Sequence, residues 1–316
     1  MSSTRIPSTP LPESGLQAGL YLCSRRVSVG LFTADGALLD SRVLPGAKSA
    51  TPAEVLRSTI SAARQLAKGQ QIERVGMAVA GKVDTDTGTL VRAGRMTDWV
   101  GTPVRHIVSD GLNADVVLGN DVVGLMLLLT QQNPVLAGKN LIYVRVGTGI
   151  GASLASWDSA VNSHSVTGVE LGHMGVTPPK GVGDIQCPCG EVNCLETFSG
   201  GHRIENLSRQ SDGTGRPTTQ QWETVVDPLA EQIAKLILSQ SPSHNDRRIG
   251  RASSVDHLIL GGAQFDSHKL LYGRIKHALR QHLPEASLPD LMEDEVIAPP
   301  AAGLALLSYS DRFVAA

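Results

Sequence analysis

A histidine and three cysteines lie close together near the middle of the chain, and they constrain its folding more than any other feature. His173 is followed by Cys187, Cys189 and Cys194, so three of the four cysteines fall within eight consecutive positions. Three thiolates and one imidazole form a closed tetrahedral ligand set that suits structural Zn²⁺. The sequence therefore predicts a zinc-bound loop.

Two other interpretations of these cysteines are less consistent with the sequence. Free cysteines are often small buried core residues, but the neighbouring Pro188 and Gly190 indicate a loop. Disulfides cannot pair three cysteines fully, and Cys23 lies far away in the sequence. Only one residue separates Cys187 from Cys189, so the spacing also differs from that of the common zinc finger.

Carboxylates flank the cluster at both ends. Glu170 precedes the histidine by three positions, and Glu196 follows the last cysteine by two. Because metal binding is coupled to the folding of its loop, an ion bound here would hold two acidic side chains in place as well as order the loop.

The pattern Glu-x-Gly-His, Cys-x-Cys-Gly and Cys-Leu-Glu resembles the signature of the ROK family, which contains bacterial sugar kinases and sugar-responsive repressors. The resemblance is dense from Gly147 to Gly200 and follows nearly the whole chain in order. It implies an α/β, two-lobed actin-like ATPase (ribonuclease H-like) fold. It further implies that zinc binds His173, Cys187, Cys189 and Cys194, and that the sugar contacts Glu170, His173 and Glu196.

The composition restricts the class of protein. The chain has 316 residues, of which 41% are hydrophobic, and its 28 basic and 30 acidic residues give a formal net charge of −2. No basic field favours nucleic acid, and no apolar run is long enough to span a membrane. Residues 1–15 are polar, so we expect a disordered tail and not a signal peptide. Clustered thiols without a secretory signal indicate the cytoplasm.

Strand and helix patterns alternate along the chain, which predicts α/β architecture. A hairpin-rich opening followed by strand–helix units occurs twice, so we expect lobes at residues 16–133 and 134–316, with the zinc loop at 170–196. The last helix is expected to pack back towards the N-terminal lobe. The predicted elements are two hairpin strands within 16–39, strands at 74–79, 115–118, 140–146, 152–156 and 256–260, and helices near 52–68, 121–132, 195–207, 220–240, 265–283 and 300–309.

Asp121 is the candidate catalytic base. It lies in Gly119-Asn120-Asp121, after a predicted strand and at the start of a predicted helix, where the helix dipole favours the ionised carboxylate that a base requires. An Asn-Asp pair before a helix is also a common N-cap, so the residues alone leave both interpretations open. The ROK resemblance implies that Asp121 is the catalytic aspartate and that Asn120 contacts the sugar.

Two glycine-rich turns are candidate nucleotide contacts. Gly147-Thr148-Gly149-Ile150-Gly151 follows one apolar strand, and Gly261-Gly262 follows another. Glycine lets the backbone approach a phosphate closely, although hairpins use the same residues. The ROK resemblance implies that Gly147, Thr148, Gly149 and Gly151 face phosphate, that Gly261 and Gly262 flank the adenosine of ATP, and that Mg²⁺ accompanies the nucleotide.

The first strand turn departs from the ROK kinase pattern Asp-x-Gly-Gly-Thr-Lys. The aligned positions read Tyr21-Leu22-Cys23-Ser24-Arg25-Arg26, without the aspartate, the glycines or the threonine. Side chains at Cys23 and Ser24 obstruct close approach of the backbone to a phosphate, and Tyr21 cannot replace a hard oxygen anion for Mg²⁺. The Arg25-Arg26 pair could still attract an anion.

Two functions are compatible with these residues. The first is an ATP- and Mg²⁺-dependent kinase that phosphorylates a hexose or N-acetylhexosamine, with Asp121 as base. The alternative is a catalytically impaired ROK-like sugar-binding or sensor protein. Arg95 lies near the position where the family often has a sugar-binding asparagine, and its charge would suit a charged sugar such as a sugar phosphate or acid. Polyphosphate is an alternative phosphoryl donor to ATP.

The expected partners are limited to small molecules and further copies of the chain. The residues before the first strand are too few for a helix-turn-helix domain, so we expect no direct nucleic-acid binding, and no membrane association. The resemblance implies a homodimer or homotetramer.

Overall fold

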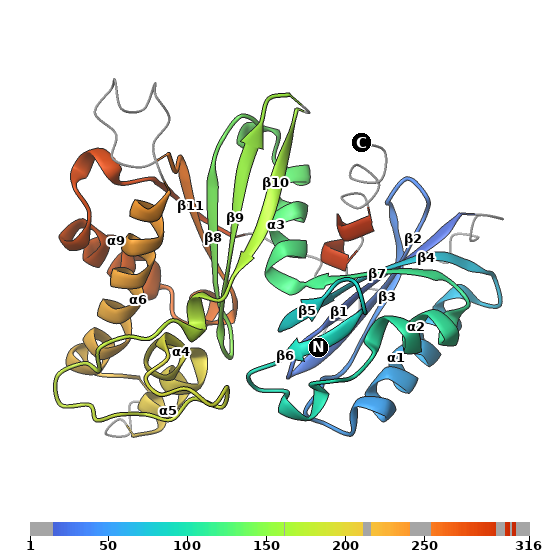
Figure 1. Cartoon of the computed structure of the whole chain (residues 1–316), viewed down its shortest axis with the longest axis horizontal. Helices are drawn as coiled ribbons and strands as arrows, with labels where there is room; N and C mark the ends of the chain where they lie inside the picture. Colours follow the sequence, from blue (N-terminus) through green and yellow to red (C-terminus); the bar gives the residue numbers. More distant parts are fainter. Residues whose placement is uncertain are drawn as a thin grey trace. The chain divides into compact units, whose positions relative to one another are not determined.

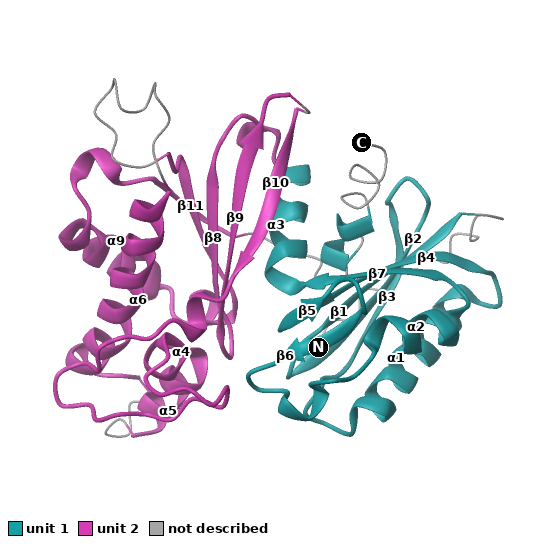
Figure 2. Cartoon of the chain, viewed as in Figure 1, with its two compact units in different colours: residues 1–132, 296–316 teal, residues 133–295 magenta. Residues whose placement is uncertain are grey.

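The computed structural model describes residues 15–160, 162–210, 216–240, 254–294, 301–303 and 305–307. The chain forms two compact units, which are shown in different colours in Figure 2. Unit 1 comprises Met1–Gln132 together with Val296–Ala316, and unit 2 comprises Asn133–Glu295. Most of the predicted tail and the last residues of the predicted final helix lie outside the described residues.

Unit 1 contains a five-stranded mixed sheet of order β3-β2-β1-β4-β7 (Figure 1). β2 is antiparallel to both β3 and β1, whereas β4 is parallel to both β1 and β7. The strands are β1 (Leu16–Leu22), β2 (Arg26–Phe32), β3 (Leu38–Pro45), β4 (Ile72–Val79) and β7 (Asp115–Asn120), and a separate hairpin pairs β5 (Lys82–Asp84) with β6 (Thr89–Arg92).

Helices pack on both faces of this sheet. The apolar sides of α1 (Pro52–Ala67) and α2 (Val104–Leu112) join the core on one face. The other face receives α3 (Asp121–Gln132) and the described residues from 301 to 307. Close packing there depends on glycine, because a Cβ atom on Gly76 of β4 would lie 1.9 Å from the carbonyl oxygen of Gly303.

The boundaries of α1 follow from its local sequence. Thr51 caps the helix, since its hydroxyl accepts a hydrogen bond from the amide of Glu54 and the Glu54 carboxylate accepts one from the amide of Thr51. Such a capping box with proline at the first helical position is a strong start signal, worth about 1 kcal/mol. The helix ends at Lys68, which has a left-handed backbone.

Unit 2 repeats the topology of unit 1, with a sheet of order β10-β9-β8-β11-β12. Here β8, β9 and β10 are antiparallel, and β11 is parallel to β8 and β12. The strands are β8 (Leu141–Val146), β9 (Ile150–Asp158), β10 (Ser163–Val169), β11 (His257–Gly261) and β12 (Asp290–Glu293). Its core is formed by one sheet face and the helices α6 (Thr219–Ser239) and α9 (Leu270–His282).

Shorter helices connect these elements. The α-helices are α4 (Leu195–Ser199), α5 (Gly201–Gln210) and α8 (Ala263–Ser267), and the 3₁₀ helices are η1 (Thr97–Trp99), η2 (Pro134–Leu136), η3 (Leu171–His173) and η4 (Glu285–Ser287). Within the described ranges, no helix combines the length and the apolar character that crossing a bilayer requires.

The structure divides two predicted helices and adds elements that the sequence did not predict. The helix predicted at 265–283 is observed as α8 and α9, because the backbone of His268 is not helical (φ −127°, ψ 75°). Residues 195–207 form two helices, because the chain has extended backbone at Gly200 and the amide of Gly201 donates to the carbonyl of Gly147. The edge strands β3, β10 and β12, the β5–β6 hairpin and α2 were absent from the predicted elements. The edge strands have largely exposed or half-buried residues, so their sequences lack a strong apolar pattern.

Candidate metal centre and active site

The four predicted metal ligands lie together in unit 2. The ligand atoms of His173, Cys187, Cys189 and Cys194 are all within 4.8 Å of one another. Cys189 Sγ is 3.6 Å from Cys194 Sγ, and Cys187 Sγ is 3.7 Å from His173 Nδ1. Tetrahedral Zn–S bonds of about 2.3 Å would separate neighbouring ligands by about 3.8 Å. The three cysteines are not in disulfides, so the cluster has the geometry of a closed metal site.

Backbone hydrogen bonds shape the loop that carries the cysteines. The amide of Cys187 donates to the carbonyl of Glu191, and the amide of Gly190 donates back to the carbonyl of Cys187. Gly190 has φ of 102° and Asn193 has φ of 59°, which are left-handed conformations that favour these two residue types. The turn residues therefore direct the thiols towards one point.

Burial opposes ionisation of two of these thiols. The pKa values of Cys187 and Cys194 are raised, mainly because the surrounding protein removes water from the thiolate. A coordinated cation reverses this preference, since a thiol that binds a metal is deprotonated. The donor set is thus suited to a soft or borderline cation such as Zn²⁺.

The predicted zinc loop, residues 170–196, packs at both of its ends against Ile150, the first residue of β9. A Cβ atom on Gly172 would lie 2.4 Å from the carbonyl oxygen of Ile150. Glu196 Oε2 accepts a hydrogen bond of 3.0 Å from the amide of Ile150, and the Glu196 side chain is buried. Glu170 is exposed at the start of η3. The structure therefore holds one of the two predicted acidic residues rigidly beside the glycine turn.

The β8–β9 turn brings the predicted nucleotide residues of unit 2 together. The amide of Gly147 donates to the carbonyl of Gly149, and the carbonyls of Gly147 and Thr148 accept from the amides of Gly201 and His202. A Cβ atom on Gly149 would lie 2.2 Å from Glu196 Oε2, whereas one on Gly147 would meet nothing within 4 Å. Glu196 therefore leaves no room for a side chain at Gly149, whereas the space beside Gly147 is open.

The second predicted glycine pair ends β11, beside the same turn. Gly262 has φ of 105°, and a Cβ atom there would lie 2.6 Å from the carbonyl oxygen of Val146. Gly261 pairs with Arg145 of β8, and so does Gly151 of β9. The predicted glycines of unit 2 therefore lie together where β8 and β11 end and β9 begins.

In unit 1 the structure separates the roles of Asn120 and Asp121. The side-chain oxygen of Asn120 accepts from the amides of Val122 and Val123, and its amide group donates to the carbonyl of Gly81. Asn120 therefore satisfies the first amides of α3, which is the role of an N-cap. Asp121 is buried, with 9% exposure, and the cap of α3 is formed by the Asn120 side chain.

Comparisons with known proteins decide the family. The sequence model of the ROK family matches residues 18–298. The chain belongs to the ROK family. A glucokinase from Streptomyces coelicolor is 24% identical over 196 residues, which are 62% of this chain and 60% of that protein. An N-acetylmannosamine kinase from Escherichia coli is 25% identical over 232 residues, covering 68% and 74%. The chain thus spans about 60% of the length of the glucokinase that it matches.

Solved structures agree on the fold. A ROK family glucokinase from Streptomyces griseus, determined in complex with glucose and AMPPNP, superposes with a TM-score of 0.71 at 18% identity, over 94% of this chain and 100% of that chain. The predicted α/β fold of the actin-like ATPase type is therefore confirmed. The repeated sheet order of the two units is the internal duplication that the sequence indicated.

The first turn of this ROK protein lies between β1 and β2 and is tied to the chain that follows β3. The amides of Gly46, Ala47 and Lys48 donate to the carbonyls of Arg25, Cys23 and Ser24, in that order. A Cβ atom on Gly46 would lie 2.1 Å from the amide nitrogen of Arg26. None of the turn residues has positive φ, so the backbone conformation itself does not require glycine.

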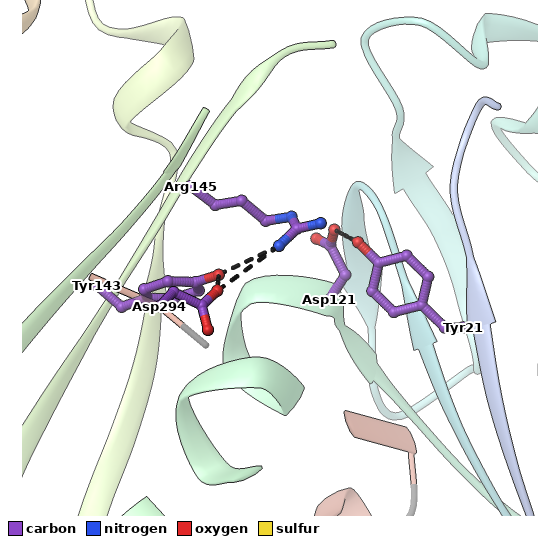
Figure 3. A network of polar contacts seen from close by, with 5 residues as sticks. All are labelled: Tyr21, Asp121, Tyr143, Arg145 and Asp294. Atoms are coloured by element: carbon purple, nitrogen blue, oxygen red, sulfur yellow. Dashed lines mark hydrogen bonds and ion pairs between the residues drawn. The ribbon is translucent and has the colours of Figure 1, made fainter. Parts of the chain in front are cut away.

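Sequence reasoning missed a buried polar contact at Tyr21. The Tyr21 side chain is 2% exposed, and its hydroxyl donates a 2.9 Å hydrogen bond to Asp121 Oδ2 (Figure 3). Tyr21 was recognised only as the residue that replaces the motif aspartate. Its partner could not be found from local patterns, because Asp121 is 100 positions away.

Unit 2 contains a second buried polar group that the sequence did not indicate. Tyr143 donates a 2.6 Å hydrogen bond to Asp294 Oδ2, and Arg145 donates to the Tyr143 hydroxyl at 3.3 Å (Figure 3). Burial raises the pKa of Tyr143, so its hydroxyl stays protonated and acts as a donor.

Arg95, the predicted contact for charged sugars, is half-buried between β6 and η1.

Proposed function

We propose that this ROK protein is a sugar kinase that transfers a phosphoryl group from ATP to a hydroxyl of a hexose or N-acetylhexosamine. The observation that carries the proposal is the position of Asp121: it is buried at the start of α3, and Asn120 performs the capping. A carboxylate held at the end of a strand and the start of a helix suits a general base. The glucokinase and N-acetylmannosamine kinase relatives support the substrate class.

The proposed roles of the remaining residues follow from their chemistry. Asp121 accepts the proton of the attacking hydroxyl, and Asn120, Glu170, His173 and Glu196 bind sugar hydroxyls. The bond from the Ile150 amide fixes one oxygen of Glu196, which orients the carboxylate. The backbone of Gly147, Thr148, Gly149 and Gly151 binds phosphate, and Gly261 and Gly262 flank the adenosine.

We infer that Zn²⁺ binds the four-residue cluster and has a structural role, because all four donors are protein atoms and the set is closed. We infer that ATP with Mg²⁺ binds at the glycine turns of unit 2, where the Cβ position of Gly147 has no other atom within 4 Å. Mg²⁺ would neutralise charge on the transferred phosphoryl group. The first turn offers no carboxylate for that ion, since Tyr21 stands where the motif has aspartate.

This difference supports a second candidate, a sugar-binding or sensor protein with impaired phosphoryl transfer. The replaced motif residues lie at the end of β1 and in the β1–β2 turn, whereas the cluster, Glu196 and the glycine turns keep the residues of the family pattern. Such a protein would bind sugar with slow turnover or none.

One experiment separates the two candidates. The purified full chain is incubated with glucose, mannose, N-acetylglucosamine, N-acetylmannosamine or a hexose phosphate, and with ATP-Mg²⁺ or polyphosphate as donor. ADP or sugar phosphate formation is measured, and sugar binding is measured by calorimetry. Turnover of about 1 s⁻¹ or faster supports the kinase and excludes the impaired protein. Sugar binding without turnover excludes the kinase.

Light scattering of the same sample tests the expected dimer or tetramer.

A further inference from the structure

The hydrogen bond between Tyr21 and Asp121 depends on a row of side chains across the sheet of unit 1. Tyr21 of β1 pairs with Ala78 of β4, which pairs with Gly119 of β7. Neighbours in register project to the same face of a sheet, so the row runs from a large side chain through a methyl group to none. The small residues leave room for the phenol ring to reach over β4 to the start of α3.

The elements that pack on this face of the sheet require small residues in the row. A Cβ atom on Gly119 would lie 2.8 Å from Leu306 Cδ2. A Cβ atom on Gly124 of α3 would lie 3.3 Å from the existing Ala78 Cβ. The phenol is therefore confined between its own strand and α3, with 2% exposure, and it has few alternative orientations.

The chemistry of the pair favours a carboxylate that is held but still able to react. A neutral hydroxyl that donates to an ionised carboxylate forms a charge-assisted bond, which is shorter and stronger than a neutral one. A carboxylate accepts bonds at two oxygens and at about four lone-pair positions. One bond from Tyr21 thus fixes the orientation of Asp121 without using all of its capacity to accept a proton.

We propose that Tyr21 is a positioning residue for the base Asp121, an inference that rests on the kinase function proposed above. An aspartate at position 21 could not take this role, because two ionised carboxylates at hydrogen-bonding distance repel each other. The exchange of aspartate for tyrosine therefore changes what β1 contributes. The strand supplies a neutral donor to the base in place of a carboxylate for a metal ion.

The test compares Tyr21→Phe with Tyr143→Phe in the full chain, using ATP-Mg²⁺ and the hexose that turns over fastest in the panel above. Both changes remove a buried tyrosine hydroxyl that donates to a carboxylate, and both keep the ring. We expect Tyr21→Phe to lower kcat by at least about tenfold, because small losses of alignment are costly. The Kd of the sugar and the KM of ATP should stay within about twofold, and Tyr143→Phe should change kcat less than Tyr21→Phe does.

A second measurement tests the pair without relying on activity. The thermal unfolding midpoint is measured for Tyr21→Phe, Asp121→Ala and the double variant. If the two side chains interact, Tyr21→Phe should lower the midpoint clearly in the wild-type background and much less in the Asp121→Ala background.

Each outcome has a distinct meaning. Equal midpoint shifts in both backgrounds would overturn the inference, as would coupling accompanied by unchanged or increased kcat in Tyr21→Phe. A loss of kcat accompanied by an equal loss of sugar affinity would also overturn it, because that indicates a general structural defect. A wild-type chain that binds sugar but does not turn over would reject the kinase function and the positioning role together, and the midpoints would still report whether the two side chains interact.

Discussion

The β1–β2 turn of unit 1 and the β8–β9 turn of unit 2 occupy the same place in two sheets of the same strand order, yet they differ in chemistry. The unit 2 turn consists of Gly147, Thr148 and Gly149, and its carbonyls are bonded to the start of α5. The unit 1 turn carries the side chains of Cys23, Ser24 and Arg25, and its carbonyls are bonded to the chain after β3. Both turns are fixed by backbone hydrogen bonds, so the fold tolerates either composition.

This comparison indicates that glycine in these turns provides space and not backbone freedom. Neither Gly147 nor Gly149 has positive φ, and the same is true of Cys23, Ser24 and Arg25. A turn can therefore lose its glycines without a change in topology while the backbone becomes less accessible to a phosphate. The sites of units 1 and 2 can diverge in function although their folds remain alike.

The largest expected effect tests the contribution of unit 1. Asp121→Asn should lower kcat by about 10²–10⁴-fold, because the amide cannot accept the hydroxyl proton, while sugar affinity stays largely intact. Steady-state kinetics and calorimetry measure the two quantities. Asp110→Asn on α2 is the matched control, since that side chain is 68% exposed. Retained activity in Asp121→Asn would show that the base is another residue.

The next effect concerns the metal loop of unit 2. Cys194→Ser should reduce bound zinc from about one equivalent to less than half and lower the unfolding midpoint, because the loop folds around its metal. Elemental analysis and calorimetry provide the measurements. Cys23→Ser is the matched control, as Cys23 is the fourth cysteine and lies in unit 1 outside the cluster. Equal zinc content in the two variants would contradict the four-ligand site.

A smaller effect is expected within the glycine turn itself. Gly149→Ala places a methyl group 2.2 Å from Glu196 Oε2, so the carboxylate must move and lose its bond to Ile150. Sugar affinity, measured without nucleotide, should fall about tenfold, and stability by about 1–3 kcal/mol. Gly147→Ala is the control, because its Cβ atom would meet nothing within 4 Å. Equal losses of sugar affinity would argue against a role of Glu196.

The smallest effect tests whether space alone distinguishes the two turns. The double variant Cys23→Gly, Ser24→Gly should lower the KM of ATP by about threefold or less, since it clears the backbone but supplies no carboxylate for Mg²⁺. Added glycines should cost about 1–2 kcal/mol of stability. Ala34→Gly, in the exposed turn after β2, controls for that entropic cost. If the KM of ATP fell by much more than tenfold, the side chains of Cys23 and Ser24 would be the main obstacle to nucleotide binding, and the missing carboxylate would matter little.

The sequence was informative wherever function depends on a short segment. The four proposed metal ligands span 22 positions, and their residue types already define a donor set that suits zinc. The strands β1, β4, β8 and β11 have apolar patterns, so the sequence predicted them, whereas the exposed edge strands β3 and β10 were missed. The continuous helix predicted at 195–207 was wrong, because a backbone contact between Gly201 and Gly147 interrupts it.

The sequence by itself thus determined the family, the duplicated α/β pattern and the loss of the first-turn motif, and it predicted the four residues that the structure brings together as a candidate metal site. Only the tertiary structure decided that Asn120 caps α3, that Glu196 is bonded to Ile150, and that Tyr21 donates to Asp121. Local patterns encode which face of a strand or helix is apolar. A hydrogen bond between side chains 100 positions apart depends on the pairing of β1, β4 and β7 and on the small residues between them, which exist only in the folded sheet.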